Sequence, residues 1–295
     1  MHTPVLLKEV IECLNPQPNE NFVDCTFGWG GHAIEIAKRI GPKGKLLGIE
    51  QDREEIKNSK DSIKDPDLKR RINVVCGNFS DLKEIVQREK FNSASGILID
   101  LGISSWHLEG SGRGFSFMRN EPLDMRLDSE NKLTAGKIVN YFSGADIEEI
   151  LREFGEEKFA RDIAEAIIQE RKLKPIETTF QLVAVLRKAL PARYQHQKLH
   201  FATKTFQALR IAVNGELGNL AIVLPQALEI LKKNGRLAVI SFHSLEDRIV
   251  KNFFRDQKKA GLVNLINKKP IQASFKEIKI NPRSRSAKMR AIEKI

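Results

Sequence analysis

Four short apolar runs in the first hundred residues constrain the fold of this chain more than any other feature. They occupy residues 21–27, 45–50, 72–76 and 96–101, and helical patterns at 32–40, 52–64 and 81–90 separate them. Because the runs are continuously apolar and not alternating, each is expected to be a strand that is buried on both faces. Such strands in alternation with helices predict an α/β domain with a mostly parallel sheet.

The pattern changes after the fourth run. Residues 105–133 are rich in Gly, Ser and Arg and are expected to form a loop. Helices alone are expected over the next segment, at 134–142, 146–172 with a break near Gly155, 178–190 and 202–213. Asp146 with Glu149 resembles a capping box at one of these helix starts.

The α/β pattern then returns. A helix is expected at 216–233 and a strand at 236–242, and residues 274–280 and the final KMRAIEKI (288–295) are expected to add two strands. The prediction is therefore an α/β domain formed by residues 1–104 and 214–295, with a loop and an all-helical domain, residues 105–213, inserted after its fourth strand.

A glycine turn follows the first predicted strand. Gly28, Gly30 and Gly31 precede a helix that opens at His32, an order that usually brings backbone close to a ligand. The turn is neither a P-loop nor a GxGxxG motif. Glu50 ends the next strand about 20 residues further on, where an acid can bind the ribose hydroxyls of an adenosine. It could also be only the polar end of a strand.

Two cofactors carry that ribose, and the turn distinguishes between them. A dinucleotide places its pyrophosphate on free N–H groups at a helix N-terminus. An acid in the first strand, Asp24, is unfavourable beside a pyrophosphate and suits the cationic end of S-adenosylmethionine. Phe79, after the third strand, could lie against the adenine or belong to the core.

Composition narrows the class of protein. Hydrophobic residues make up 41% and charged residues 29%, as in soluble globular proteins, and no stretch approaches the ~18 apolar residues of a membrane span. The N-terminal segment lacks signal-peptide features and is expected to be a short amphipathic helix. Three cysteines without CxxC spacing, Cys13, Cys25 and Cys76, indicate reduced thiols and a cytoplasmic protein. No metal site is expected, since the histidines have no suitable companions.

The net charge of +11 lies entirely in the C-terminal region. Residues 248–295 contain 14 Lys and Arg side chains and three acidic ones, so residues 1–247 are balanced. A basic region attached to a part of the chain with no net charge indicates that the protein binds a polyanion. Nucleic acid is favoured as this partner; the alternatives are a membrane surface or a basic region that only aids solubility.

The later motifs are more specific than the glycine turn. They follow one another as HTPVLLKEV (2–10), FVDCTFGWGGH (22–32), DLGISS (100–105), RGFSFM (113–118), PLDMR (122–126), GEEKFAR (155–161), ATKTFQALRIAVNGEL (202–217), ISFHSLEDRIVK (240–251) and NPRSRSAKMR (281–290). Together they closely resemble the RsmH (MraW) family of ribosomal RNA methyltransferases across nearly the whole chain. The resemblance implies a class I methyltransferase with a Rossmann-like sheet. It also implies that S-adenosylmethionine methylates N4 of one cytidine in the decoding region of bacterial 16S ribosomal RNA.

The resemblance also implies a set of cofactor-binding residues. With Asp24 from the argument above, the set is Asp24, Gly30, Gly31, His32, Glu50, Phe79, Asp100 and His107. The chain departs from the family pattern at His107, usually Gln, at Trp106, usually Pro, and at Glu50, more often Asp. Cys25 and Trp29 also differ, and none of these changes removes a group that the chemistry requires.

Two residues are candidates for catalysis. The exocyclic nitrogen of cytosine is a poor nucleophile, so acceptors around the amine can hold its hydrogens and take up developing positive charge. Asp100 in the DLG loop is the candidate acceptor, although the resemblance places it mainly on the cofactor. His243 follows the fifth strand and could line the same pocket or be a structural, hydrogen-bonded histidine.

RNA contacts are expected from three regions. The loop 110–126 offers arginines for phosphates and phenylalanines for stacking, unless it is a packed surface loop. The end of the helical domain is expected to form another wall of an RNA cleft, and the basic C-terminal region to add sequence-independent affinity. The candidate residues are Arg113, Phe115, Phe117, Arg126, Lys204, Arg210, Arg283, Arg285 and Lys288.

The expected partner is 16S ribosomal RNA or the small ribosomal subunit, with no membrane and no metal, and the oligomeric state stays open. The competing hypotheses are a nicotinamide oxidoreductase on a related sheet, a methyltransferase for another RNA base, and a non-catalytic RNA-binding assembly factor.

Overall fold

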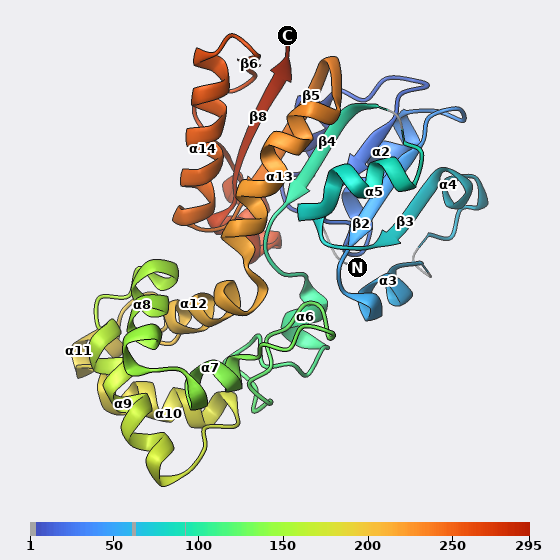
Figure 1. Ribbon diagram of the computed structural model, residues 1–295. Helices are drawn as coiled ribbons and strands as arrows, with labels where there is room; N and C mark the ends of the chain where they lie inside the picture. Colours follow the sequence, from blue (N-terminus) through green and yellow to red (C-terminus); the bar gives the residue numbers. More distant parts are fainter. Residues whose placement is uncertain (1–3, 61–62, 92) are drawn as a thin grey trace. The chain divides into compact units, whose positions relative to one another are not determined.

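The computed structural model describes residues 4–60, 63–91 and 93–295 and divides the chain into two compact units (Figure 1). The sheet unit comprises Met1–Gly102 and Leu217–Ile295, and the helical unit comprises Ile103–Glu216. The predicted boundaries at 104/105 and 213/214 lie within three residues of this division.

The sheet unit is built on one eight-stranded sheet in the order β3-β2-β1-β4-β5-β8-β6, with β7 paired to β8. Strands β1 to β5 run parallel to one another, and β8 runs antiparallel to β5, β6 and β7. The strands are β1 (Phe22–Asp24), β2 (Leu46–Glu50), β3 (Ile72–Cys76), β4 (Ala94–Asp100), β5 (Leu231–Ser241), β6 (Val263–Leu265), β7 (Ile271–Gln272) and β8 (Lys288–Lys294). A mostly parallel α/β sheet was predicted from the apolar runs, and the structure confirms it.

Helices cover both faces of this sheet (Figure 1). One face packs against α5 (Leu82–Arg88), α13 (Glu216–Ile230) and α14 (Ser244–Lys259). The other packs against α1 (Leu7–Leu14), α2 (Gly31–Arg39) and α4 (Pro66–Arg71). Two apolar layers explain why the central strands carry apolar residues at consecutive positions, as in β2, where all five residues are buried.

The remaining elements of the sheet unit connect these layers. They are α3 (Arg53–Lys60), η1 (Phe79–Asp81), α15 (Phe275–Ile280) and η2 (Pro282–Ser286). The expected helix 52–64 corresponds to α3, and its residues 61–62 lie outside the described residues. The short helix α4 was not predicted, although Asp65 caps it and Pro66 occupies its first turn.

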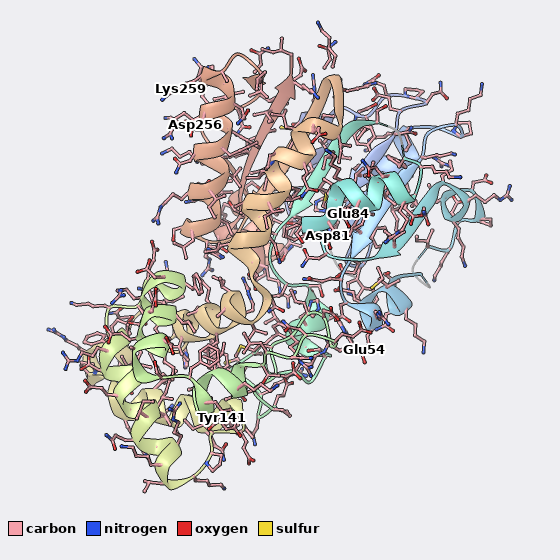
Figure 2. All side chains as sticks on the ribbon, viewed as in Figure 1. Glu54, Asp81, Glu84, Tyr141, Asp256 and Lys259 are labelled. Atoms are coloured by element: carbon pink, nitrogen blue, oxygen red, sulfur yellow. The ribbon has the colours of Figure 1, made fainter. Side chains whose placement is uncertain are left out.

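The helical unit has a separate core. Its helices are α6 (Ser105–Glu109), α7 (Ala135–Tyr141), α8 (Gly144–Gly155), α9 (Ala160–Leu173), α10 (Thr179–Ala189), α11 (Ala192–Gln195) and α12 (Thr203–Asn214). The expected break near Gly155 separates α8 from α9. Apolar side chains from α7 to α10 and α12 share one buried cluster. Tyr141, at the end of α7, is 81% exposed (Figure 2).

Two local predictions are wrong. Residues 274–280 form α15 and not a strand, because the Ser274 side chain accepts the N–H of Glu277 and caps a helix start. The capping box of α8 pairs Ser143 with Asp146, so Asp146 occupies the third helical position and is not the cap.

The basic C-terminal region is folded and is not a loose tail. Strand β8 lies between β5 and β6, and its Met289 and Ile292 are fully buried. Asp247 of α14 accepts two hydrogen bonds from Arg290, which fixes part of the basic charge in place. Asp256 and Lys259 lie on the same helix, away from the sheet (Figure 2).

Within the described ranges, no single helix has both the length and the apolarity to cross a membrane; α12 and α13, taken as one bent pair, meet that test by length and composition only.

Candidate functional site

Five parallel strands bring the predicted cofactor residues to one edge of the sheet. Asp24 is the last residue of β1, Glu50 the last of β2 and Asp100 the last of β4. Parallel strands end on the same side, where open α/β sheets bind their ligands. The glycine turn also begins at this edge, directly after β1.

The start of the glycine turn is anchored by the side chain of Asp24 and by the backbone of Asp100. The N–H of Thr26 donates to Asp24 Oδ1 at 3.1 Å, and the Thr26 hydroxyl accepts the N–H of Asp100 at 2.7 Å. Gly30 has a φ of +74°, and a Cβ there would lie 2.8 Å from Cζ of Phe27. A side chain at position 30 is therefore disfavoured, which keeps the backbone accessible at this point of the turn.

Glu50 is oriented by three backbone N–H groups. Gly28 donates to Oε2 at 3.0 Å, and Gln51 and Asp52 donate to Oε1 at 2.8 and 3.0 Å. These bonds fix the orientation of the carboxylate at the end of β2. This geometry fits the predicted ribose contact, which stays a prediction.

Asp100 differs from Glu50 in having an acceptor without a partner. Its Oδ2 lies 3.6 Å from Nδ1 of His32, whereas its Oδ1 is buried and receives no hydrogen bond from the described residues. Burial raises the pKa of Asp100 well above its usual range, and the nearby Asp24 and Glu246 add to the effect. An acceptor that is desolvated and unpaired in this way is completed by a ligand donor or cation.

Asp24 belongs to the same buried group of carboxyls. Burial raises its pKa to about 7; the hydrogen bonds from Thr26 oppose the rise and the charge of Glu50 adds to it. Two carboxyls that are costly to ionise, Asp24 and Asp100, therefore meet at one edge, and a bound cation would lower that cost. The ammonium and sulfonium groups of S-adenosylmethionine supply such a charge, so the residues present fit this cofactor.

Two further cofactor candidates have defined surroundings. Phe79 opens η1 after β3 and is half-buried against the core on that face of the sheet. His107 lies in the helical unit, where its Nδ1 is 3.0 Å from the Ser104 hydroxyl and its ring meets Phe115 edge-on. Their contacts with the cofactor remain predictions.

His243 has a structural role in this fold. It is the N-cap of α14, and its Nδ1 accepts the N–H of Glu246 at 3.4 Å. Glu246 in turn accepts the N–H groups of Phe242 and His243 at 2.7 and 3.2 Å. These contacts correspond to the structural alternative considered for His243, and a catalytic role is untested.

Most of the basic side chains predicted to bind RNA from the helical unit are bonded within that unit. Arg113 donates to the carbonyls of Arg126 and Leu127, and Lys204 donates to the carbonyl of Glu156. Arg126 forms a two-point ion pair with Asp124, and Arg210 forms one with Glu216.

The two phenylalanines of the loop 110–126 are packed inward to different degrees. Phe115 is 6% exposed and belongs to the core of the helical unit, which corresponds to the alternative of a packed loop; its stacking on a base stays a prediction. Phe117 is half-buried, stacked on His200 at 4.4 Å and edge-on to Phe206 at 5.4 Å. Apolar burial explains both, because the loop covers the end of a helical core.

The candidates of the C-terminal region are more accessible. Arg285 is exposed in η2 and Arg283 is half-buried beside it. Lys288 begins β8 and its Nζ lies 3.7 Å from Asp247.

Sequence reasoning missed Thr26 and Glu246. Thr26 links Asp24 to Asp100 across neighbouring strands, and only the pairing of β1 with β4 reveals this. Glu246 is 2% exposed and close enough to Asp100 to raise its pKa. The spacing of His243 and Glu246, three residues apart, was a signal for a helix cap that could have identified it.

The strand order is that of the class I methyltransferase fold, and the family model places the chain among methylases, so the class is S-adenosylmethionine-dependent methyltransferases. A methyltransferase structure from Streptococcus mutans, solved in complex with SAH, has this fold at a TM-score of 0.50 and 10% identity, with both chains fully covered.

The chain belongs to the MraW methylase family, whose family model matches residues 1–295. Curated relatives called "Ribosomal RNA small subunit methyltransferase H" cover the whole chain. The one from Clostridium botulinum (strain Kyoto) is 43% identical with 99% of its length covered, and the one from Symbiobacterium thermophilum is 42% identical with 96% covered. The predicted family, class and cofactor are confirmed, and the nicotinamide oxidoreductase hypothesis is rejected.

Proposed function

We propose that this chain methylates N4 of a cytidine in the decoding region of bacterial 16S ribosomal RNA, within the cytoplasm. The observation that carries the chemistry is Asp100, an unpaired buried acceptor that lies beside the glycine turn. The substrate class rests on relatives at 41–43% identity that are called ribosomal RNA small subunit methyltransferases.

The residues at the sheet edge divide into those that hold the cofactor and those that face the reaction. S-adenosylmethionine, when bound, supplies an electrophilic methyl group on a sulfonium. Asp24, Glu50 and the backbone of Gly30 and Gly31 would hold its polar groups. Phe79 and His107 would complete the adenosine contacts.

Positioning is the main contribution expected of this protein. The lone pair of the cytosine amine is delocalised, and alignment of the two reacting groups can contribute about 7–11 kcal/mol. Asp100 Oδ1 can accept one hydrogen of the amine, which draws the nitrogen lone pair toward the methyl group and compensates developing positive charge. The raised pKa of Asp100 suits a group that is neutral without ligands and becomes charged beside a cation.

RNA binding is proposed for the side chains that remain accessible. Arg283, Arg285 and Lys288 would contact phosphates, and Phe117 would contribute only if the loop 110–126 rearranges. Arg113, Arg126, Lys204 and Arg210 would support the RNA surface through the contacts that order the helical unit.

The test is methyl transfer from labelled S-adenosylmethionine to small ribosomal subunits, and to their free RNA, from cells lacking this protein. Label in N4-methylcytidine after digestion would support donor, substrate and target atom together. Label in another nucleoside would overturn the target base. Binding of the cofactor without any transfer would favour the non-catalytic assembly factor.

A further inference from the structure

A chain of contacts joins α15 to the cofactor edge of the sheet through the N-terminal turn, residues Pro4–Leu6. Oε1 of Glu277 accepts the N–H of Leu6 at 2.8 Å. The carbonyl of Val5 lies 2.9 Å from Nε2 of His32, whose Nδ1 lies 3.6 Å from Asp100. All of these residues belong to the sheet unit.

The N-terminal turn has a conformation that needs support. Leu6 has a φ of 55°, a left-handed conformation that is unfavourable for a non-glycine residue. Its side chain is fully buried, and Val5 is 6% exposed. The Glu277 carboxylate fixes the one backbone group of Leu6 that points toward α15, so it stabilises this conformation directly.

The same turn touches the cofactor loop at a second point. A Cβ on Gly31 would lie 2.4 Å from Cγ of Pro4, so the turn packs directly on the second glycine of the pair. Displacement of the turn would therefore open space next to Gly31 as well as release His32.

The contact with Val5 determines which nitrogen of His32 carries hydrogen. A backbone carbonyl can only accept, so the hydrogen must be on Nε2. In the neutral ring Nδ1 then has a lone pair, and this is the nitrogen that faces Asp100. The N-terminal turn thereby sets the tautomer, and with it the donor or acceptor character, of the side chain beside Asp100.

Glu277 is less exposed than the other charged residues of α15. Lys276 and Lys279 are exposed, and Phe275 is 84% exposed, whereas Glu277 is half-buried against Leu6. An acidic residue in the most basic part of the chain would repel a polyanion. The contact with the N-terminal turn explains the presence of Glu277 better than polyanion binding does.

We propose that Glu277 is a positioning residue for the methyl-donor site, acting through the N-terminal turn on the tautomer and placement of His32 beside Asp100. This rests on the methyltransferase class assigned above and not on the identity of the RNA base.

The experiment compares Glu277→Ala with Glu277→Gln, which keeps an acceptor oxygen for Leu6, and with Lys279→Gln on the same helix as control. Binding of SAH is measured by calorimetry on the full chain without RNA. Nitrogen NMR of the imidazole, assigned with His32→Gln, reports the tautomer of His32.

For Glu277→Ala we expect about five- to tenfold weaker SAH binding, the size of one ordinary hydrogen bond, and a mixed tautomer at His32. Glu277→Gln should stay near the wild type in both measurements, and Lys279→Gln should change neither. With RNA as substrate, the effect should fall on the KM for S-adenosylmethionine and leave the KM for RNA unchanged.

Three results would overturn the proposal. Wild-type SAH binding and tautomer in a folded Glu277→Ala would show that the contact does not act on the site. Equal losses in Ala and Gln would assign the effect to charge and not to the hydrogen bond. If Glu277→Ala does not fold, Glu277→Met is used, which keeps a side chain of similar length without an acceptor oxygen, and an unchanged His32 resonance there has the same meaning. Absence of N4-methylcytidine with normal SAH binding would instead count against the proposed base alone.

Discussion

The cofactor edge of the sheet unit and the loop 110–126 of the helical unit are both rich in charged residues, but they use them in opposite ways. At the sheet edge, Asp100 keeps a buried oxygen without a partner in the described structure. In the loop, Arg126 bonds Asp124 and the carbonyls of Ser129 and Asn131.

This difference in pairing indicates that the sheet edge is a binding site, whereas the charged residues of the loop stabilise the fold. Buried polar groups in folded proteins are usually paired, so an unpaired one indicates a missing ligand. A fully paired arginine has its donors occupied by the chain and orders a loop that has little other secondary structure. Charge in a motif therefore does not identify a ligand contact until its partners are known.

The largest effect is expected at Asp100. Asp100→Asn should lower the rate of methyl transfer about 100- to 1000-fold, because the amide keeps an acceptor oxygen but lacks the negative charge that would compensate the developing positive charge. The midpoint of thermal unfolding should stay equal or rise, since a buried carboxyl is replaced by a neutral amide. Single-turnover transfer, SAH calorimetry and thermal unfolding measure the three quantities. A loss of affinity that accounts for the whole loss of rate would leave Asp100 with a cofactor role only.

A substitution of Arg126 in the loop should lower the stability of the protein and leave cofactor binding unchanged. Arg126→Gln removes a two-point ion pair and two hydrogen bonds to carbonyls at a partly buried position, and should lower the free energy of unfolding by about 1–3 kcal/mol. SAH affinity should not change. Arg161→Gln breaks an exposed pair on α9 and should have no measurable effect in denaturant titrations. An unaltered unfolding curve for Arg126→Gln would contradict the scaffold role.

The pH dependence of stability should reveal the buried carboxyl at Asp24. Its pKa is about 7 in the folded protein against 3.8 normally, so between these values the folded state holds a proton that the unfolded state has lost. The contribution of Asp24 to the free energy of unfolding is fully present below pH 4. It falls by about 1.4 kcal/mol per pH unit between pH 4 and pH 7.

Asp24→Asn should remove that decline. The variant should match the wild type near pH 4 and unfold at a higher temperature at pH 8, while SAH binds it more weakly. Equal unfolding temperatures of the two proteins at pH 8 would show that Asp24 is not desolvated as the structure indicates.

The smallest effect is expected on RNA affinity. Arg285→Gln should weaken RNA binding a few-fold and reduce the slope of log affinity against log salt by about 0.7–0.9, as expected for one phosphate contact. Arg70→Gln, an exposed change on α4, is the control and should leave the slope unaltered. Retention of the full slope in Arg285→Gln would remove this arginine from the RNA surface.

The sequence predicted the structure correctly where a sequence pattern has only one physical cause. Continuous apolar runs predicted the parallel strands, since only a sheet covered on both faces requires them. It failed at 274–280, where the Ser274 cap outweighed the apolar pattern. It left open whether Phe115 faces a base or a core, because that core includes residues far away in the sequence, such as Phe206 and Val213.

By itself, then, the sequence determined the class of fold, the family and the edge at which the cofactor residues meet, because these follow from local pattern and from motifs in order. Only the tertiary structure decided which of the charged residues are already paired, that Thr26 links two acids, and that Glu277 reaches Leu6 from the far end of the chain. Hydrogen bonds between residues more than 200 positions apart leave no periodicity in the sequence. They are set by the packing of the elements that carry them.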